Sequence, residues 1–293
     1  MNGLVLIDKP AGCTSHDVVN RWRKLANTKR AGHLGTLDPM ATGLLALVTG
    51  TATRLAQFFG KDDKTYLAGI TFGLESDSYD ADGELVSTGV APPSDPAIVC
   101  EALNRFRGRL LQTPPPVSAK KIAGVPAYKL ARRNVPFTLE PVEVEIKHLE
   151  VRDFSGVRLE VAVTCSAGTY IRSLAHDLGL LLGCGAILSD LRRIRAGAFS
   201  VEQAHTISEL EDLAAAGRLP EVVIPAAFLL PDLPAEHFDS SIITQIRQGR
   251  DFRTSPFVVR PGAPRVKALS RSGELVAIGE LVMPNLYHPS TVL

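Results

Sequence analysis

The stretch from Arg30 to Gly43 reads Arg-Ala-Gly-His-Leu-Gly-Thr-Leu-Asp-Pro-Met-Ala-Thr-Gly. Its three glycines disfavour a helix, and Pro39 pushes the residue before it, Asp38, towards extended backbone angles. An amphipathic segment precedes the stretch and an apolar segment, Leu44 to Val48, follows it. We therefore expect a charged loop that is anchored at both ends, and functional side chains concentrate on loops of this kind.

Two ionisable side chains in this loop are candidates for chemistry, His33 and Asp38. Taken alone, an Asp-Pro pair is typical of a turn or a helix cap. Taken alone, a histidine between glycines is more often a hydrogen-bonding partner for a loop carbonyl than a functional group. The complete string, rather than either residue, favours a functional site.

That string resembles the Gly-His-x-Gly-x-Leu-Asp-Pro-x-Ala-x-Gly signature of the TruB-type tRNA pseudouridine synthases. In that family the aspartate is the catalytic residue, and the histidine helps to displace the target base from the RNA loop. The resemblance implies these two roles for Asp38 and His33. Leu34 and Thr36 occupy variable positions of the signature.

Two shorter strings resemble the same family. Asp-Lys-Pro-Ala-Gly-Cys-Thr-Ser, which ends at Ser15, implies that Lys9 and Pro10 support the active-site loop without taking part in the chemistry. A phosphate-loop interpretation of Lys9 fails, because the spacing Gly-x-x-x-x-Gly-Lys-Ser/Thr is absent. Lys-Thr-Tyr, which ends at Tyr66, implies that this ring stacks on the target uracil, an interaction worth ~1–3 kcal/mol per base.

A further string, Gly-Thr-Tyr-Ile-Arg, ends at Arg172. By resemblance, Tyr170 and Arg172 belong to the substrate site. Arg172 is a suitable partner for Asp38, since an opposite charge within reach keeps a carboxylate ionised. Downstream, the resemblance places Leu191 beside the displaced base, and we expect the arginines that follow Leu191 to face phosphates.

The acidic segment from Ser76 to Gly83 invites a calcium-loop interpretation. Calcium is excluded because position twelve of such a loop would be Gly89, where a bidentate glutamate is required. The family carries an aspartate in this loop close to the active-site arginine, and the resemblance implies that role for Asp80.

Basic residues gather in two runs, although the formal net charge of the 293 residues is only +1. Asn20 to Arg30 holds five basic residues and Arg105 to Arg133 holds eight, and neither run contains an acidic residue. Local charge governs contact with phosphates. The second run overlaps a proline-rich stretch that is disfavoured as core structure and resembles the family insertion that grips the T loop of tRNA. The resemblance implies RNA contacts for Lys121, Tyr128 and Arg132.

Composition sets wider limits on the class of protein. With 45% hydrophobic and 22% charged residues, the chain can bury a large core. It shows no signal-peptide pattern, no run of membrane-spanning length and no cofactor fingerprint. The spacing of the four cysteines, Cys13, Cys100, Cys165 and Cys184, fits no zinc site, and we expect reduced thiols in or near the core. These features predict a cytoplasmic protein without a metal or cofactor.

Periodicity predicts the main elements. Apolar alternation favours strands over Lys64 to Leu74, Val142 to Val151 and Val157 to Cys165. Thr14 and Asp17 form the pattern of a capping box at the start of a helix. After about Leu233 we expect one short helix, over Ser240 to Gln248, and two strands, over Arg265 to Leu269 and Glu274 to Val282, too few residues for a rich core.

The resemblance implies an α+β pseudouridine synthase fold with a mixed, mainly antiparallel sheet flanked by helices. It divides the chain into a catalytic domain over residues 1–230, with an RNA-gripping insertion at about 112–138, and a β-rich module over 231–293 similar to the PUA RNA-binding domain. The implied reaction is the isomerisation of uridine 55 in the tRNA T loop by a monomer that needs no protein partner. Two other functions stay open: a tRNA-folding chaperone without catalysis, and a synthase that depends on a guide RNA.

Overall fold

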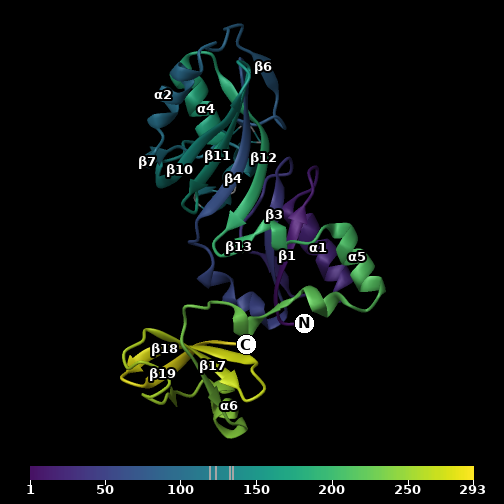
Figure 1. Ribbon diagram of the computed structural model, residues 1–293, viewed down its shortest axis with the longest axis vertical. Helices are drawn as coiled ribbons and strands as arrows, with labels where there is room; N and C mark the ends of the chain where they lie inside the picture. The colour runs from purple at the N-terminus through teal and green to yellow at the C-terminus, as the bar shows by residue number, and fades with distance from the viewer. Residues whose placement is uncertain (119, 123, 132, 134) are drawn as a thin grey trace.

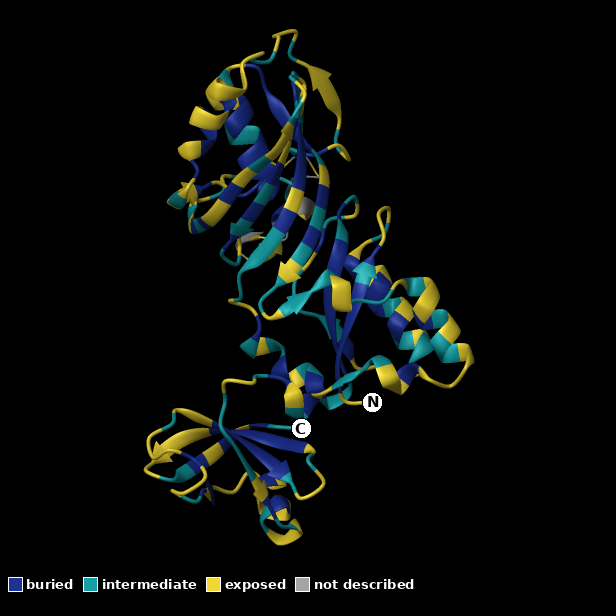
Figure 2. Cartoon of the chain, viewed as in Figure 1, coloured by how far each residue is buried: buried dark blue, intermediate teal, exposed yellow. Residues whose placement is uncertain are grey.

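The computed structural model describes residues 1–118, 120–122, 124–131, 133 and 135–293. Figure 1 shows a large sheet with helices beside it and, at the opposite end of the molecule, a smaller β-rich module formed by the C-terminal residues. Buried residues follow the middle of the large sheet and continue into the strands of the smaller one (Figure 2). Among the described residues, no helix is long and apolar enough to cross a membrane.

The large sheet has ten strands, and eight of them form a continuous path. In spatial order they are β14 (Ile224–Pro225), β1 (Gly3–Lys9), β3 (Thr42–Thr49), β12 (Ala186–Ala196), β4 (Lys64–Phe72), β11 (Arg158–Cys165), β10 (Val142–Phe154) and β7 (Gly108–Gln112), with β2 (Ala31–His33) paired to β3 and β13 (Phe199–Ser200) paired to β12. β3 and β12 run parallel, and the other pairings among the described strands of this sheet are antiparallel. The prediction of a mixed, mainly antiparallel sheet is confirmed.

Helices lie beside both halves of this sheet (Figure 1). The half near β1 carries α1 (Ser15–Leu25) and α5 (Ile207–Ala215), and the half near β10 carries α2 (Pro96–Asn104) and α4 (Ile171–Leu182). The predicted capping box starts α1: the Thr14 hydroxyl accepts from the Asp17 amide, and the Asp17 carboxylate accepts from the Thr14 amide. Among the described residues, the 3₁₀ segments that connect the larger elements are η1 (Gly50–Phe58), η2 (Val201–Gln203), η3 (Leu219–Val222) and η4 (Ala226–Phe228).

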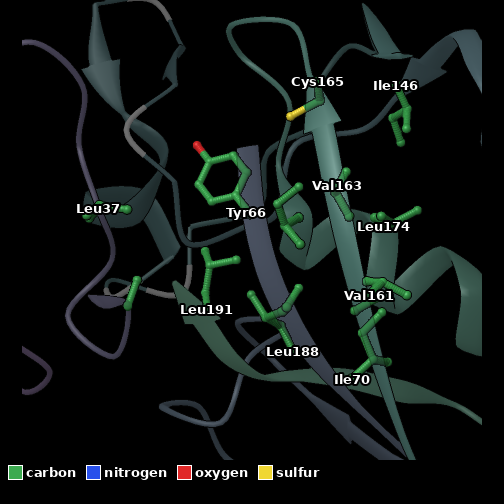
Figure 3. Packing of buried hydrophobic residues seen from close by; sticks show 14 of the residues in the cluster. Leu37, Tyr66, Ile70, Ile146, Val161, Val163, Cys165, Leu174, Leu188 and Leu191 are labelled. Carbon is green, nitrogen blue, oxygen red and sulfur yellow. The ribbon is translucent and has the colours of Figure 1, made fainter. Parts of the chain in front are cut away.

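The alternation read from β4 is confirmed, since Tyr66, Ala68, Ile70 and Phe72 are all buried. Figure 3 shows part of the core into which this face packs. Two predictions about burial need correction. Cys165 and Cys184 are buried, but Cys100 is exposed, because it lies on the outward side of α2. The proline-rich stretch also contributes buried residues, among them Gln112 and Ser118 in its first part.

Short elements occupy the two loops beside the sheet. Residues 74–87 form a two-stranded hairpin of β5 (Leu74–Ser76) and β6 (Leu85–Ser87). The insertion contains β8 (Lys121–Ile122), β9 (Val125–Pro126) and α3 (Ala127–Ala131). β8 and β9 pair with each other and form a sheet of their own.

The C-terminal module has more structure than its sequence predicted. The expected helix is α6 (Ser240–Arg247), and the expected strands are β17 (Arg265–Ser270) and β18 (Leu275–Met283). Three further strands complete a five-stranded sheet, β15 (Ala235–Phe238), β16 (Phe252–Arg253) and β19 (Leu286–Val292). The expectation of a poor core is wrong: ten buried residues, including Phe238, Ile246 and Tyr287, form a cluster of their own.

This module is fastened to the large sheet by apolar contacts and hydrogen bonds. Leu269, Leu275 and Ile278 of the module share a buried cluster with residues of β1, β3 and η1. The Gln57 side chain of η1 donates to the Thr291 hydroxyl at 3.0 Å. The buried Lys267 ammonium donates to the carbonyls of Ala227 at 3.0 Å and Leu229 at 3.3 Å, and burial lowers its pKa.

Candidate active site

The candidate site is centred on residues 34–41, which connect β2 to β3 and are called the active-site loop below. The sequence predicted a loop from Arg30 onward, but residues 31–33 form a short strand because their backbone pairs with the end of β3. His33 therefore lies on a strand, opposite Leu47. The other end of the loop is fixed where Thr42 and Gly43 pair with Arg192 and Arg193 of β12.

Asp38 lies in this loop with 30% of its side chain exposed. Its carboxylate faces the guanidinium of Arg172 in α4: Nε lies 3.0 Å from Oδ2, and Nη2 lies 3.2 Å from Oδ1. A two-pronged pair of this kind fixes the orientation of a carboxylate as well as its charge. The predicted contact between these two residues, 134 positions apart in the sequence, is confirmed.

Arg172 is itself held on its other side. Its Nη1 lies 3.3 Å from Oδ2 of Asp80 and donates to the Ser78 carbonyl at 3.0 Å. The side chains of Arg172 and Asp80 are only 6% and 5% exposed. One buried cation thus bridges two carboxylates, of which only that of Asp38 is open to a ligand.

Asp80 experiences opposing influences. Burial raises the pKa of its carboxyl group, while the Ser78 hydroxyl and the Arg172 charge act in the opposite direction. Its Oδ1 accepts from the Ser78 hydroxyl at 2.5 Å and from the Asp82 amide at 3.1 Å. These contacts satisfy the buried carboxylate and aim its second oxygen at Arg172.

Tyr66 and Leu191 lie on two paired strands, β4 and β12. Both are buried at 8% exposure and belong to the same core cluster as Leu37, which precedes Asp38. In Figure 3 the Tyr66 ring lies next to Leu191, and its hydroxyl points towards the side on which Leu37 lies. Burial raises the pKa of the Tyr66 phenol. The contacts of Tyr66 and Leu191 with a displaced base stay predictions.

His33 is half-buried at the start of the loop. Burial lowers the pKa of its imidazole, and the charge of Arg193 acts in the same direction. Its Nδ1 is shielded from solvent and has no hydrogen-bond partner within the described part of the chain. The role of His33 in displacing a base stays a prediction.

Lys9 lies behind the loop and is fully buried. Its ammonium donates to three carbonyls, those of Pro10 at 2.8 Å, Cys13 at 2.7 Å and Pro39 at 3.2 Å. Burial lowers the pKa of this ammonium. Because its three donors are used by backbone carbonyls, the geometry agrees with the supporting role predicted for Lys9 and Pro10.

Tyr170 precedes Arg172 at the start of α4 and is half-buried. Its backbone is paired with the side chain of Gln112, which donates to the Tyr170 carbonyl at 3.0 Å and accepts from its amide at 2.8 Å. This contact joins the first part of the insertion to the active-site helix. No signal in the sequence marks Gln112, since its partner lies 58 residues away.

The predicted RNA-binding residues lie in or beside the insertion. The backbone of Lys121 belongs to β8 and that of Tyr128 to α3, whereas Arg132 lies outside the described residues. The expectation that the arginines after Leu191 face phosphates is wrong for Arg193, which is 3% exposed and donates to backbone carbonyls. Arg192 forms a two-pronged pair with Asp8, at 2.7 and 3.0 Å.

The geometry around Asp38 defines the class of site. A partly exposed carboxylate that is oriented by a buried arginine can stabilise positive charge on a substrate or attack it. No group of three or more His, Cys, Asp and Glu side chains that could hold a metal ion occurs among the described residues. Of the two carboxylates that contact Arg172, that of Asp38 is accessible, and this arrangement is typical of an enzyme that acts through a carboxylate.

Comparison with known families agrees with this class. Residues 23–171 match the model of the TruB family pseudouridylate synthase N-terminal domain, and residues 172–230 match the tRNA pseudouridylate synthase B C-terminal domain. The chain is 50% identical over 293 residues to tRNA pseudouridine synthase B of Solibacter usitatus, with 100% of both chains covered. It is 37% identical over 285 residues to the protein of the same name from Geobacter sulfurreducens, covering 96% of this chain and 93% of the relative. The chain belongs to the TruB family of pseudouridine synthases.

Solved structures show the same fold. A Cbf5-Nop10-Gar1 complex contains a chain with a TM-score of 0.71 and 28% identity, covering 97% of this chain and 79% of that chain. An H/ACA RNP bound to a substrate RNA containing 2'-deoxyuridine contains a chain with a TM-score of 0.70 and 25% identity, covering 99% and 84%. The predicted pseudouridine synthase fold is confirmed.

Proposed function

We propose that this chain converts uridine 55 in the T loop of tRNA to pseudouridine, with Asp38 as the catalytic residue. The observation that carries the proposal is the Asp38 carboxylate, which is partly exposed and oriented by the buried Arg172. Membership of the TruB family supports the reaction, and relatives named tRNA pseudouridine synthase B support tRNA as the substrate.

The reaction breaks the bond between ribose C1′ and uracil N1 and joins C1′ to C5. N1 gains a proton and C5 loses one, so the nucleoside keeps its composition. Positive charge develops on the sugar as the first bond breaks, and an anionic oxygen placed beside C1′ stabilises that charge. Asp38 supplies the oxygen. Arg172 orients the carboxylate through two contacts, and Asp80 balances the arginine charge.

The target base must leave its stack before Asp38 can reach the sugar, at a cost of a few kcal/mol. Stacking of the extruded uracil on Tyr66 offsets part of that cost, since such contacts are worth ~1–3 kcal/mol per base. Leu191 and Tyr170 complete the walls around the base. His33, at the start of the loop, fills the space that the base leaves in the RNA.

Recognition of the T stem-loop falls to the insertion, through Lys121, Tyr128 and Arg132. We propose that residues 231–293 form a PUA-like module that adds further RNA contacts, and that the boundary between the two domains lies near residue 230. The protein acts in the cytoplasm as a monomer, without a cofactor and without an obligate protein partner.

Two other functions are less well supported. A non-catalytic tRNA chaperone has no need for a partly exposed carboxylate that a buried arginine orients. A guide-RNA-dependent synthase is disfavoured because the relative at 50% identity over the whole chain is named as a tRNA enzyme. Both alternatives predict that the isolated chain releases no proton from uracil C5 in naked tRNA.

The direct assay is tritium release from C5-labelled uridine in a tRNA transcript, with the isolated chain and no added RNA or protein. We expect about one tritium released per tRNA. A transcript with cytidine at position 55 is the control and should release none. Full binding without tritium release would favour the chaperone, and release only after addition of a guide RNA would favour the third function.

A further inference from the structure

The backbone of the active-site loop is held by polar side chains from outside the loop. The Asp38 side chain is oriented by Arg172, but the place of its Cα depends on the peptide groups on either side. Lys9 fixes the carbonyl of Pro39, which follows Asp38. Two more side chains, Ser15 and Arg193, contact the residues that precede it.

Ser15 is the first residue of α1 and is 2% exposed. Its hydroxyl donates to the Leu37 carbonyl at 2.9 Å and accepts from the Leu37 amide at 2.8 Å. One hydroxyl therefore binds both polar groups of the residue before Asp38. The Leu37 carbonyl and the Asp38 amide nitrogen belong to the same peptide group. The hydrogen bond from Ser15 therefore fixes the orientation of the peptide group that precedes the Asp38 Cα.

Arg193 approaches the loop from β12 and is also buried. Its Nε donates to the Leu44 carbonyl at 2.8 Å, and Nη2 donates to the Gly35 carbonyl at 3.0 Å. The first of these carbonyls belongs to β3 and the second to the loop, so one rigid guanidinium joins the loop to the strand that follows it. Among the described residues, no carboxylate forms an ion pair with the Arg193 guanidinium. Its hydrogen bonds to these residues go to backbone carbonyls.

The contacts of Ser15 and Arg193 with the loop matter for the site because they determine the distance between the Asp38 carboxylate and the Arg172 guanidinium. Asp38 comes from the β2–β3 half of the sheet, whereas Arg172 comes from α4 in the other half. Their ion pair of 3.0 Å forms only if the backbone of the active-site loop has a fixed position relative to α4. A loop that shifted by 1 Å would keep its fold but lose this alignment, and such shifts cost about 100-fold in rate.

We propose that Ser15 and Arg193 are positioning residues for the reaction, which fix the loop backbone so that the Asp38 carboxylate meets Arg172 and the substrate sugar. The inference rests on the proposed function. Neither residue touches the substrate. Their loss should therefore lower the rate of the chemical step and leave tRNA affinity largely unchanged.

The main test compares Ser15→Ala, Ser15→Thr and Thr14→Ala. Thr14→Ala is the matched control, because it removes the neighbouring cap of the same helix without a contact to the loop. Single-turnover conversion of uridine in a tRNA transcript is measured at saturating enzyme, at a temperature where all variants are folded, together with the Kd for tRNA.

We expect Ser15→Ala to lower the single-turnover rate about 30- to 100-fold, with Kd within about twofold. Ser15→Thr, which keeps the hydroxyl, should recover most of that rate. Thr14→Ala should stay within about twofold of the unmodified enzyme even where its unfolding temperature falls as far as that of Ser15→Ala. A Ser15→Ala rate equal to the Thr14→Ala rate would overturn the role of Ser15.

Arg193→Lys provides a second, independent test. Lysine keeps the charge but cannot donate to Leu44 and Gly35 in the same fork. We expect a loss of rate of about 10- to 100-fold at unchanged Kd, against no loss for Arg158→Lys, a partly exposed arginine that pairs with Asp190. Equal rates for the two variants would overturn the role of Arg193. If the unmodified enzyme forms no pseudouridine, the proposed function is wrong. If the unmodified enzyme is active and Ser15→Ala and Arg193→Lys are equally active, only the positioning role is wrong.

Discussion

At the scale of single residues, the site depends on how one guanidinium is shared. Arg172 contacts Asp38 through Nε and Nη2 and reaches Asp80 and the Ser78 carbonyl through Nη1. A single buried cation between two carboxylates would be costly if either contact were lost, because the remaining charges would be desolvated and unbalanced. The planar five-donor head of arginine is suited to this task.

Arg172→Lys tests that geometry. A lysine ammonium is a point charge and cannot span both carboxylates and the Ser78 carbonyl. We predict a fall of about 100-fold or more in the single-turnover rate, with tRNA affinity within several-fold. Arg218→Lys, at an exposed pair with Glu221, is the control and should retain the normal rate. Activity of Arg172→Lys within threefold of normal would show that the shared contacts are dispensable.

His33 predicts a dependence of stability on pH. Burial lowers the pKa of its imidazole from the usual 6.5. As the pH falls below 6.5, the unfolded chain takes up a proton that the folded chain resists, so the free energy of unfolding decreases until the folded-state pKa is reached.

Urea unfolding at about pH 7.5 and about pH 5.5 measures this effect. The unmodified chain should lose more stability across the interval than His33→Gln, which cannot take up the proton. His176, whose pKa is also lowered by burial, is present in both proteins and cancels in the comparison. An equal or larger loss in His33→Gln would contradict the prediction.

At the scale of elements, the active-site loop ends where two strands meet in parallel. Gly43 has φ +95°, and a Cβ built there would lie 2.3 Å from the Arg193 carbonyl oxygen. Only a residue without a side chain allows β3 and β12 to approach so closely at this point. The pairing of β3 with β12 therefore requires a glycine at position 43, the last position of the family signature.

Gly43→Ala should destabilise the protein by at least about 3 kcal/mol, because both the backbone angle and the space oppose a side chain. Gly12→Ala is the matched control: Gly12 has φ +78°, but no atom lies within 4 Å of a Cβ placed there. It should cost only about 1–2 kcal/mol, the price of the left-handed conformation alone. Urea unfolding measures both values, and equal costs would contradict the close approach of the strands.

Local patterns were sufficient for some elements and not for others. The capping box of α1 and the alternation of β4 could be read from the sequence because each is decided within a few residues. β15, β16 and β19 could not, since the first two have only four and two residues and the third contains a proline, so that pairing with other strands decides them.

The same distinction applies to the site. Motif resemblance indicated Asp38, Arg172 and Asp80, and the structure brings these three together. Ser15, Gln112 and Arg193 were missed because their contacts join positions 22, 58 and 158 residues apart through backbone groups. A hydrogen bond to a distant carbonyl leaves no pattern in a single sequence.

At the scale of the whole molecule, the C-terminal module is joined to the segment that precedes β4. η1 leaves β3 and leads towards β4, the strand that begins two residues before Tyr66. The module packs against η1 through a shared apolar cluster. Figure 1 shows the module at one end of the molecule, with the large sheet extending away from it. An RNA that contacts both parts would be held at two separated places.

Salt dependence tests the contribution of the insertion to RNA binding. Each phosphate contact that is lost should lower the slope of log Kd against log salt by about one unit. We predict this change for Lys121→Ala and for Arg132→Ala, together with weaker binding. Arg218→Ala, at an exposed ion pair, should leave the slope unchanged. If both insertion variants show the same slope as the unmodified chain, the insertion makes no phosphate contacts through Lys121 and Arg132.

The central claim is that one carboxylate performs the isomerisation, and Asp38→Asn tests it most directly. The amide keeps the shape of the side chain but removes its charge. Pseudouridine formation in a tRNA transcript is measured under single-turnover conditions, together with the Kd for that tRNA. We expect no detectable product from Asp38→Asn, with a Kd within about tenfold of the unmodified enzyme. Near-normal turnover by Asp38→Asn would contradict it.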